Sequence, residues 1–395
     1  MIWEPKADGD YVLEISDTTG AGSDTAAYRV EIEPAPDAVF SLLSGFGDWN
    51  ESLRHVGFAV PQGGRRTVNV SLPHGLGNTF TEPFDLVARG LPPGVRLVSP
   101  RVPAGHSSTT RWPVQLVADA SAAPSAATFT LEAQPADDAR RLLGGSQQNL
   151  PFINHSGGDA WRTVRLDRFV LAVTDPAPFS IDIEPPTVPI VRGGELSIPV
   201  RITRRPGFDE PIDFDCDFAP PGVNPQPQST IAPGETTGLL KLSADANARL
   251  GAAPLYVTAL VSHGSAAQPL GAMQICTSSQ IVDLTVAEPF VELASQPGSI
   301  RRGERKRFVW SVQHKSSFEG DASVRLLGLP KGLRVVEPLP VITKQSRDFA
   351  FEVEATDDAL LGAVKDLSCE ITVQVAGQEI HQRSGKGTLR IDPRL

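Results

Sequence analysis

The chain has 395 residues, a formal net charge of -10, and 35 residues each of Gly and Pro. Gly and Pro together make up about 18% of the chain, against roughly 12% in average usage, and this much proline argues against a helical protein. The negative charge argues against a general nucleic-acid binder, and no apolar run approaches the ~20 residues of a membrane span. The length predicts several domains.

Residues 1–34 lack the basic and apolar regions of a secretory signal and hold two predicted strands, 11–15 and 27–32. Trp3, the run Asp8-Gly-Asp-Tyr11 and the Gly/Asp-rich loop after it resemble the C-terminal half of bacterial pre-peptidase C-terminal domains. Those domains are secreted, non-catalytic β-sandwiches found beside peptidases. The resemblance implies a truncated β fragment, upstream domains of the same polypeptide as partners, and an extracellular or cell-surface location.

An internal repeat organises the rest of the chain. Residues 80–95 recur at 208–223 with eight of sixteen positions identical, and a weaker third copy spans 318–333. A Gly-containing turn precedes each copy, and short Pro-containing linkers separate the copies. These landmarks predict three tandem domains joined as a semi-rigid rod. Their ranges are 37–175 with an insertion near 134–165, 178–287, and 289–393.

The apolar residues inside the repeats alternate with a period of two, as at Leu196, Ile198, Val200 and Ile202. This period predicts strands that bury one face. Six or seven short strands in one repeat predict an all-β chain of antiparallel β-sandwiches. The Gly-Leu-Pro-Pro-Gly-Val turn also resembles that of bacterial immunoglobulin-like domains, and this resemblance covers residues 37–393. The one helix candidate is 136–143, in the insertion. The expected strands of the middle repeat lie near 180–184, 188–191, 196–203, 211–218, 237–243, 254–262 and 280–286.

Three cysteines are too few for a disulfide framework and do not have metal-site spacing. Cys216 and Cys369 fall at apolar positions of alternating strands, which predicts buried core residues. Cys276 is the one expected to be exposed. A Cys216–Cys276 disulfide stays an alternative for an oxidising compartment.

Asp213, Asp215 and Asp217 alternate with the apolar residues of one strand, so they share its opposite face. Carboxylates are ligands for Ca²⁺, which makes this triplet a candidate metal site. The competing interpretation is a solvated face, because the sister repeats lack the triplet and the strand would need loop ligands. The aspartates of the N-terminal fragment carry the same two interpretations, calcium ligands or turn formers.

Large aromatic residues supply the candidate binding site. Trp112 and Trp310 share strand parity with apolar neighbours and are predicted core residues. Trp49 and Trp161 lie in segments that only the first repeat has, so they are candidate ligand-binding residues for a carbohydrate or protein, or simple caps on a sandwich end. The basic run 301–307 is a candidate contact for an anionic polysaccharide or acidic partner, with a solvated hairpin tip as the alternative.

No nucleophile elbow, Cys-His pair or phosphate-binding glycine loop occurs. Residues 155–159 contain triad residue types but as neighbours in one loop, so no catalytic residue is predicted. The sequence favours a non-enzymatic, extracellular spacer or adhesion region of a larger secreted or surface-attached bacterial protein, whose ligand would be a polysaccharide or a surface protein. Two alternatives stay open: a carbohydrate- or protein-binding module, and the C-terminal accessory region of a secreted peptidase or other hydrolase.

Overall fold

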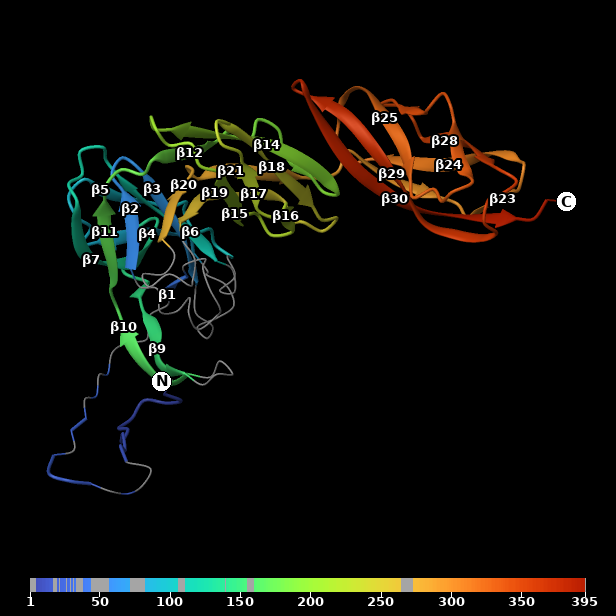
Figure 1. The fold of residues 1–395 in the computed structure, drawn as a ribbon. Helices are drawn as coiled ribbons and strands as arrows, with labels where there is room; N and C mark the ends of the chain where they lie inside the picture. The colour runs from blue at the N-terminus through green and yellow to red at the C-terminus, as the bar shows by residue number, and fades with distance from the viewer. Residues whose placement is uncertain are drawn as a thin grey trace.

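The computed structural model describes residues 5–16, 20, 22–25, 27–28, 30, 32, 38–43, 57–71, 82–105, 111–138, 140–154, 160–263 and 273–394. Every regular element in these ranges is a β-strand, so the prediction of an all-β chain is confirmed. The sandwiches follow one another along the molecule, and the last one lies far from the N-terminal segment (Figure 1). In the same ranges no helix is long and apolar enough to cross a bilayer.

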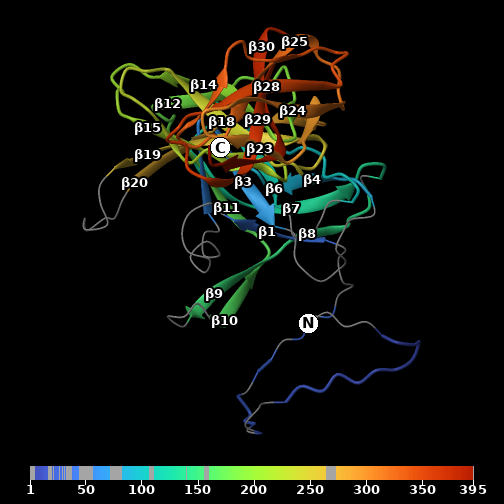
Figure 2. The ribbon, with the colours of Figure 1, turned by 90° about the vertical axis from the view of Figure 1, so that its right-hand side faces the viewer.

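The first repeat forms one bent sheet in the order β2-β11-β7-β8-β1-β3-β6-β5, with β4 paired to β7. Strands β9 and β10 form a separate hairpin that projects from the body of the repeat (Figures 1 and 2). The bounds are β1 Ala38–Leu43, β2 Gly57–Pro61, β3 Arg65–Ser71, β4 Phe84–Arg89, β5 Val95–Val98, β6 Trp112–Ala118, β7 Ser125–Pro135, β8 Gly144–Ser146, β9 Gln148–Asn154, β10 Ala160–Leu166 and β11 Phe169–Thr174.

The second repeat is a sandwich of two sheets. One contains β12, β14, β18 and β16, and the other runs β13-β21-β19-β15-β17 with β20 paired to β19. The alternation predicted for residues 196–202 is confirmed, because Leu196, Ile198, Val200 and Ile202 are all buried. The bounds are β12 Phe179–Ile183, β13 Ile190–Val191, β14 Gly194–Arg204, β15 Ile212–Phe218, β16 Val223–Pro225, β17 Ser229–Ile231, β18 Thr237–Ala244, β19 Gly251–His263, β20 Met273–Ser278 and β21 Val282–Ala287.

The third repeat has the same plan, with β22-β24-β28-β26 facing β23, β30, β29, β25 and β27. In all three repeats a short early strand lies parallel to the last strand, as the pairs β2–β11, β13–β21 and β23–β30. The bounds are β22 Val291–Ser295, β23 Gly298–Arg301, β24 Arg305–His314, β25 Glu319–Leu327, β26 Leu333–Val336, β27 Val341–Ile342, β28 Asp348–Ala355, β29 Gly362–Val375 and β30 Gln378–Asp392.

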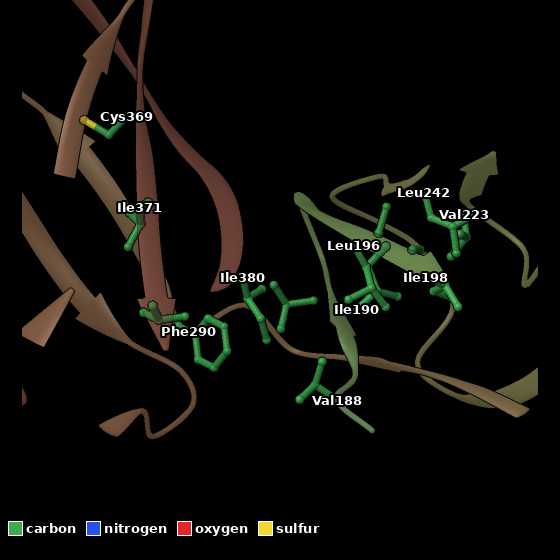
Figure 3. Packing of buried hydrophobic residues seen from close by; sticks show 14 of the residues in the cluster. Val188, Ile190, Leu196, Ile198, Val223, Leu242, Phe290, Cys369, Ile371 and Ile380 are labelled. Carbon is green, nitrogen blue, oxygen red and sulfur yellow. The ribbon is translucent and has the colours of Figure 1, made fainter. Parts of the chain in front are cut away.

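The second and third repeats share a sheet and a core. Strand β14 pairs with β30 through Gly194↔Gln382 and Glu195↔His381, so one nine-stranded sheet crosses the junction. Apolar side chains from both sides, Val188 and Ile190 on one and Phe290 and Ile380 on the other, belong to one continuous cluster (Figure 3). The two sandwiches therefore meet as one packed body.

The structure corrects two predictions. Residues 136–143 form turns and extended chain rather than a helix over their described positions, because Leu143 is buried and its amide bonds back to Ala133 of β7. The described residues of 11–15 and 27–32 form no strand, and the side chain of Val12 is 95% exposed. Two isolated strands have no further sheet on which to bury an apolar face. The pre-peptidase C-terminal resemblance is not confirmed.

A pair of glycines in the third repeat tests the packing around Trp310. Gly385 and Gly377 both have positive φ, 83° and 78°, so alanine at either costs about 1–2 kcal/mol of backbone strain. A Cβ at Gly385 would lie 2.5 Å from the Trp310 ring, whereas one at Gly377 would meet nothing within 4 Å. We expect Gly385→Ala to lose a further ~1–3 kcal/mol to overpacking. Urea unfolding measures the difference, and equal losses in the two variants would contradict it.

Candidate functional surfaces

The candidate aromatic site lies mostly outside the described residues. Trp49 and the loop 155–159 are outside them, and Trp161 lies in β10, whose hairpin with β9 projects from the first repeat (Figure 2). Ligand binding by Trp49 and Trp161 therefore stays a prediction. The other two tryptophans are core residues as predicted, with Trp112 6% and Trp310 0% exposed.

The aspartates of β15 share the predicted face but do not converge on one point. Asp213 accepts a hydrogen bond from the Thr230 hydroxyl at 2.6 Å, and Asp215 accepts one from the amide of Cys216 at 2.8 Å. They border a shallow hollow with Asp217 and Thr258. Among the described residues, no group of three acidic, histidine or cysteine side chains is placed to hold a metal ion. Calcium binding at Asp213, Asp215 and Asp217 has no preformed ligand set and stays a prediction.

The cysteines are free thiols, so the Cys216–Cys276 disulfide considered from the sequence is not formed. Cys216 of β15 points into the core. Cys276 of β20 is paired with Leu260 of β19, and Leu260 is paired with Asp213 of β15, so Cys276 lies on the same outer face as Asp213. The two thiols are thus on opposite faces of a sheet and two strands apart. Burial of Cys216 and Cys369 confirms their predicted core positions, and Cys276 is half-buried.

Strands of the first repeat cover part of the outer face of β15, β19 and β20. The Thr67 amide donates to the Ser278 hydroxyl at 2.9 Å, and the Gln115 side-chain amide donates to the Ser279 carbonyl at 2.7 Å. The Arg65 guanidinium pairs with Asp182 at 2.6 Å. Thr67 and Gln115 are buried although both are polar. Periodicity within one repeat cannot reveal these residues, because their partners belong to the next repeat.

A buried polar group lies at the centre of this junction. The Tyr256 hydroxyl donates to the side-chain oxygen of Asn69 at 3.1 Å, and the Asn69 side-chain amide donates to the Asp217 carbonyl at 3.2 Å. Burial raises the pKa of Tyr256 well above its usual value. Asp217 is exposed in part, but the protein around its carboxylate removes water from the charged form and so raises its pKa. The nearby Thr258 hydroxyl acts in the opposite direction and lowers this pKa. Burial also lowers the pKa of Arg66, which contacts the Cys276 sulfur.

Aromatic packing closes one side of the same junction. Trp112 of β6 and Phe218 of β15 meet edge to face, with ring centroids 6.3 Å apart. Pro103, Pro221 and Leu250 line a cleft of about 180 Å³ beside them. The indole nitrogen of Trp112 donates to the Pro100 carbonyl at 2.8 Å. Both rings are buried, with Trp112 6% and Phe218 9% exposed, so they belong to the core of the junction.

The basic run of the third repeat forms the turn between β23 and β24 and the start of β24. Arg305 and Arg334 both donate to Glu354, and these two hydrogen bonds hold the pKa of Glu354 below its usual value. The Arg302 guanidinium donates to the Ala359 carbonyl at 2.7 Å. Arg307 is exposed and has no side-chain partner among the described residues. Part of the run therefore stabilises its own repeat and part faces solvent.

The cysteine environments predict a simple reactivity pattern. The thiolate is the nucleophile, and burial raises the pKa of Cys216 to about 12 and also raises that of Cys369. We expect one fast-reacting thiol in the native protein at pH 8, and none in Cys276→Ser. Titration with a chromogenic disulfide reagent measures both, and denaturant should release all three thiols. Fewer than three in denaturant would reveal a disulfide, and a fast phase surviving in Cys276→Ser would show an open core.

The hydrogen bond of the Tyr256 hydroxyl provides a test of the junction between the first and second repeats. Tyr256→Phe leaves the Asn69 oxygen buried without its donor, which costs about 1–2 kcal/mol. Chemical unfolding should show this loss in the transition of the first two repeats. Tyr28→Phe is the matched control, because Tyr28 is 77% exposed, and its midpoint should not move. Equal midpoints for the two variants would mean that the buried hydrogen bond contributes nothing.

No protein-family model and no curated protein matches the sequence. Solved structures give matches of low identity. Fibronectin(III)-like modules of Clostridium thermocellum CbhA match at 12% identity and a TM-score of 0.18, over 63% of this chain and 94% of that one. Escherichia coli alpha-2-macroglobulin matches at 10% identity and a TM-score of 0.26, over 92% of this chain and 32% of that one. A marsupial T cell receptor matches at 10% identity and a TM-score of 0.19, over 83% of this chain and 97% of that one. Likenesses at this level concern the fold alone.

Proposed function

We propose that the chain is a non-catalytic spacer, a rigid β-sandwich array within a larger secreted or surface-attached bacterial protein. The observation that carries this proposal is the continuity of the second and third repeats through one sheet and one core. A flexible tether would need solvent-filled linkers, whereas the amide of Arg383 donates to the carbonyl of Gly193 at 2.7 Å across this junction. The array holds whatever is attached to it at a fixed distance and direction.

The junction between the first and second repeats supports the same function by other means. Its contacts are side-chain hydrogen bonds, the Arg65–Asp182 pair and the Trp112–Phe218 contact. Phe218 and Tyr256 of the second repeat belong to the core of the first. Separating these repeats would expose apolar rings and leave buried polar groups unpaired, and both changes cost free energy.

The secreted or surface location and the adhesion role belong to the proposal and derive from the sequence resemblances. The upstream partners, and the alternative of an accessory region of a secreted hydrolase, have the same basis. In each version this chain itself has no turnover. Hydrolysis of a peptide or glycoside panel by the purified chain would contradict the proposal.

Gly193 offers a direct test of rigidity. Its φ is 70°, and a Cβ there would lie 2.7 Å from the carbonyl oxygen of Arg383 in the next repeat. Gly193→Ala should open the junction, so that small-angle scattering shows a broader range of shapes and hydrogen exchange of the Arg383 amide accelerates. Gly207→Ala is the matched control, because its φ is 84° and a Cβ there meets nothing within 4 Å. A flexible wild-type chain, or a Gly193→Ala variant that behaves like Gly207→Ala, would contradict the spacer model.

A further inference from the structure

The same turn occurs at the corresponding end of each repeat. The amides of Gly63, Gly193 and Gly303 donate to the carbonyls of Asp119, Ala244 and Ala355 at 3.2, 3.0 and 2.7 Å. The residue before each glycine donates its amide to the end of the last strand of its own repeat. These bonds are Gln62 to Thr174, Arg192 to Ala287 and Arg302 to Asp392. The three turns are therefore structurally equivalent.

Two of the three turns contact the next repeat of the chain. After Gly63, Arg65 pairs with Asp182, and its carbonyl accepts from the Thr277 hydroxyl. After Gly193, the chain pairs with the start of β30, and Glu195 lies 3.7 Å from the Arg383 guanidinium. In both cases the next repeat contributes a strand near the end of its sequence, β20 or β30. Opposite charges also meet at each junction. Arg65 faces Asp182 of β12, the first strand of the second repeat, and Glu195 faces Arg383 of the late strand β30.

The third turn has the same free edge. Strand β12 covers β14 only from Val200 onward, which leaves the start of β14 open to β30. Likewise, β22 covers β24 only from Trp310 onward, so the β24 edge beside Glu304 and Arg305 has no strand in the described residues. An unpaired strand edge is a template for adding another strand.

The exposed side chains of this edge are basic. Arg301, Arg305, Lys306 and Arg307 are all exposed. Among the described residues, Arg301 and Arg307 have no side-chain partner. Arg305, which also donates to Glu354 of its own repeat, occupies the position of Arg65, which pairs with an aspartate in the first junction. A strand that pairs with this edge would place acidic side chains opposite the arginines.

We propose that the turn at residues 301–307 docks another β-sandwich domain, through a late strand of that domain that presents acidic side chains. This inference rests on the proposed spacer function and names the partner class for the end of the array. A second copy of this chain does not fit. Strands β20 and β30 already lie in junctions, and β10 near the end of the first repeat carries Arg162 and Arg165. Continuity with the two occupied junctions and charge complementarity both favour an acidic sandwich.

The test extends the full chain after Asp392 with a second copy of residues 288–392 in which His381 and Arg383 are both replaced by Glu. The matched control is the same extension with the native sequence, whose His381 and Arg383 would face the basic turn. Hydrogen exchange by mass spectrometry follows the amide of the copied residue 383. In the native junction this amide donates to Gly193; in the new one its acceptor would be Gly303.

We expect exchange at that amide to be slower by about tenfold or more in the charge-reversed extension than in the native-sequence extension. Arg305→Glu with Arg307→Glu should reverse the difference, because the native-sequence extension would then place its basic side chains opposite glutamate, as in the Glu195–Arg383 pair. Slow exchange in the rest of the copied repeat shows that it is folded. Equal exchange in both folded extensions would overturn the inference, and so would binding of the turn to heparin without docking of either extension, because that outcome assigns the run to a polyanion.

The original Arg383 amide separates this result from the spacer proposal. If it stays protected while the copied amide does not, the rigid array stands and only the docking turn fails. If the original amide also exchanges freely, the second and third repeats are not held together, and the spacer function fails with the inference.

Discussion

The constraint behind this array is that a strand edge near the end of each sandwich needs partners for its backbone groups. A buried amide or carbonyl without a partner costs free energy, so the next repeat has to supply one. In the second repeat, Gly194 and Glu195 pair with β30 as one more strand of the sheet. In the first repeat the partner is a side chain instead of a strand, since the Ser278 hydroxyl of the second repeat accepts a hydrogen bond from the Thr67 amide.

These two solutions give the junctions different chemical characters. The strand-paired junction allows the apolar cores of two repeats to merge, with Phe290 and Ile380 packed toward Val188. The side-chain junction instead buries polar residues such as Asn69 and Tyr256, which must satisfy one another. A repeated fold therefore does not require a repeated interface, because equivalent positions are free to carry a glycine, an arginine or a glutamate.

The sequence predicted well what depends on neighbours within one repeat. The period of two placed Ile198 and Val200 in the core, and the same reasoning placed Trp310 and Cys369. The three-residue strands β16 and β17 were not predicted, since three residues carry no clear period, and the six-residue strand β20 was not predicted either. Polar residues buried between repeats also escaped prediction, because Ser278 looks like a solvent-exposed serine until the Thr67 amide of the first repeat contacts it. The period identified β15 correctly, but whether its aspartates converge depends on their local hydrogen bonds.

The parallel strand pairs give the molecule a mechanical property. In the third repeat β23 lies beside β30 with Gly298 opposite Leu389 and Arg301 opposite Asp392, and β13–β21 and β2–β11 repeat this arrangement. Tension applied between the two ends of a sandwich pulls these strands past each other along their length. All the hydrogen bonds of a pair then bear the load together, instead of opening one after another. A chain built this way transmits force along its axis without lengthening until a whole strand pair slips.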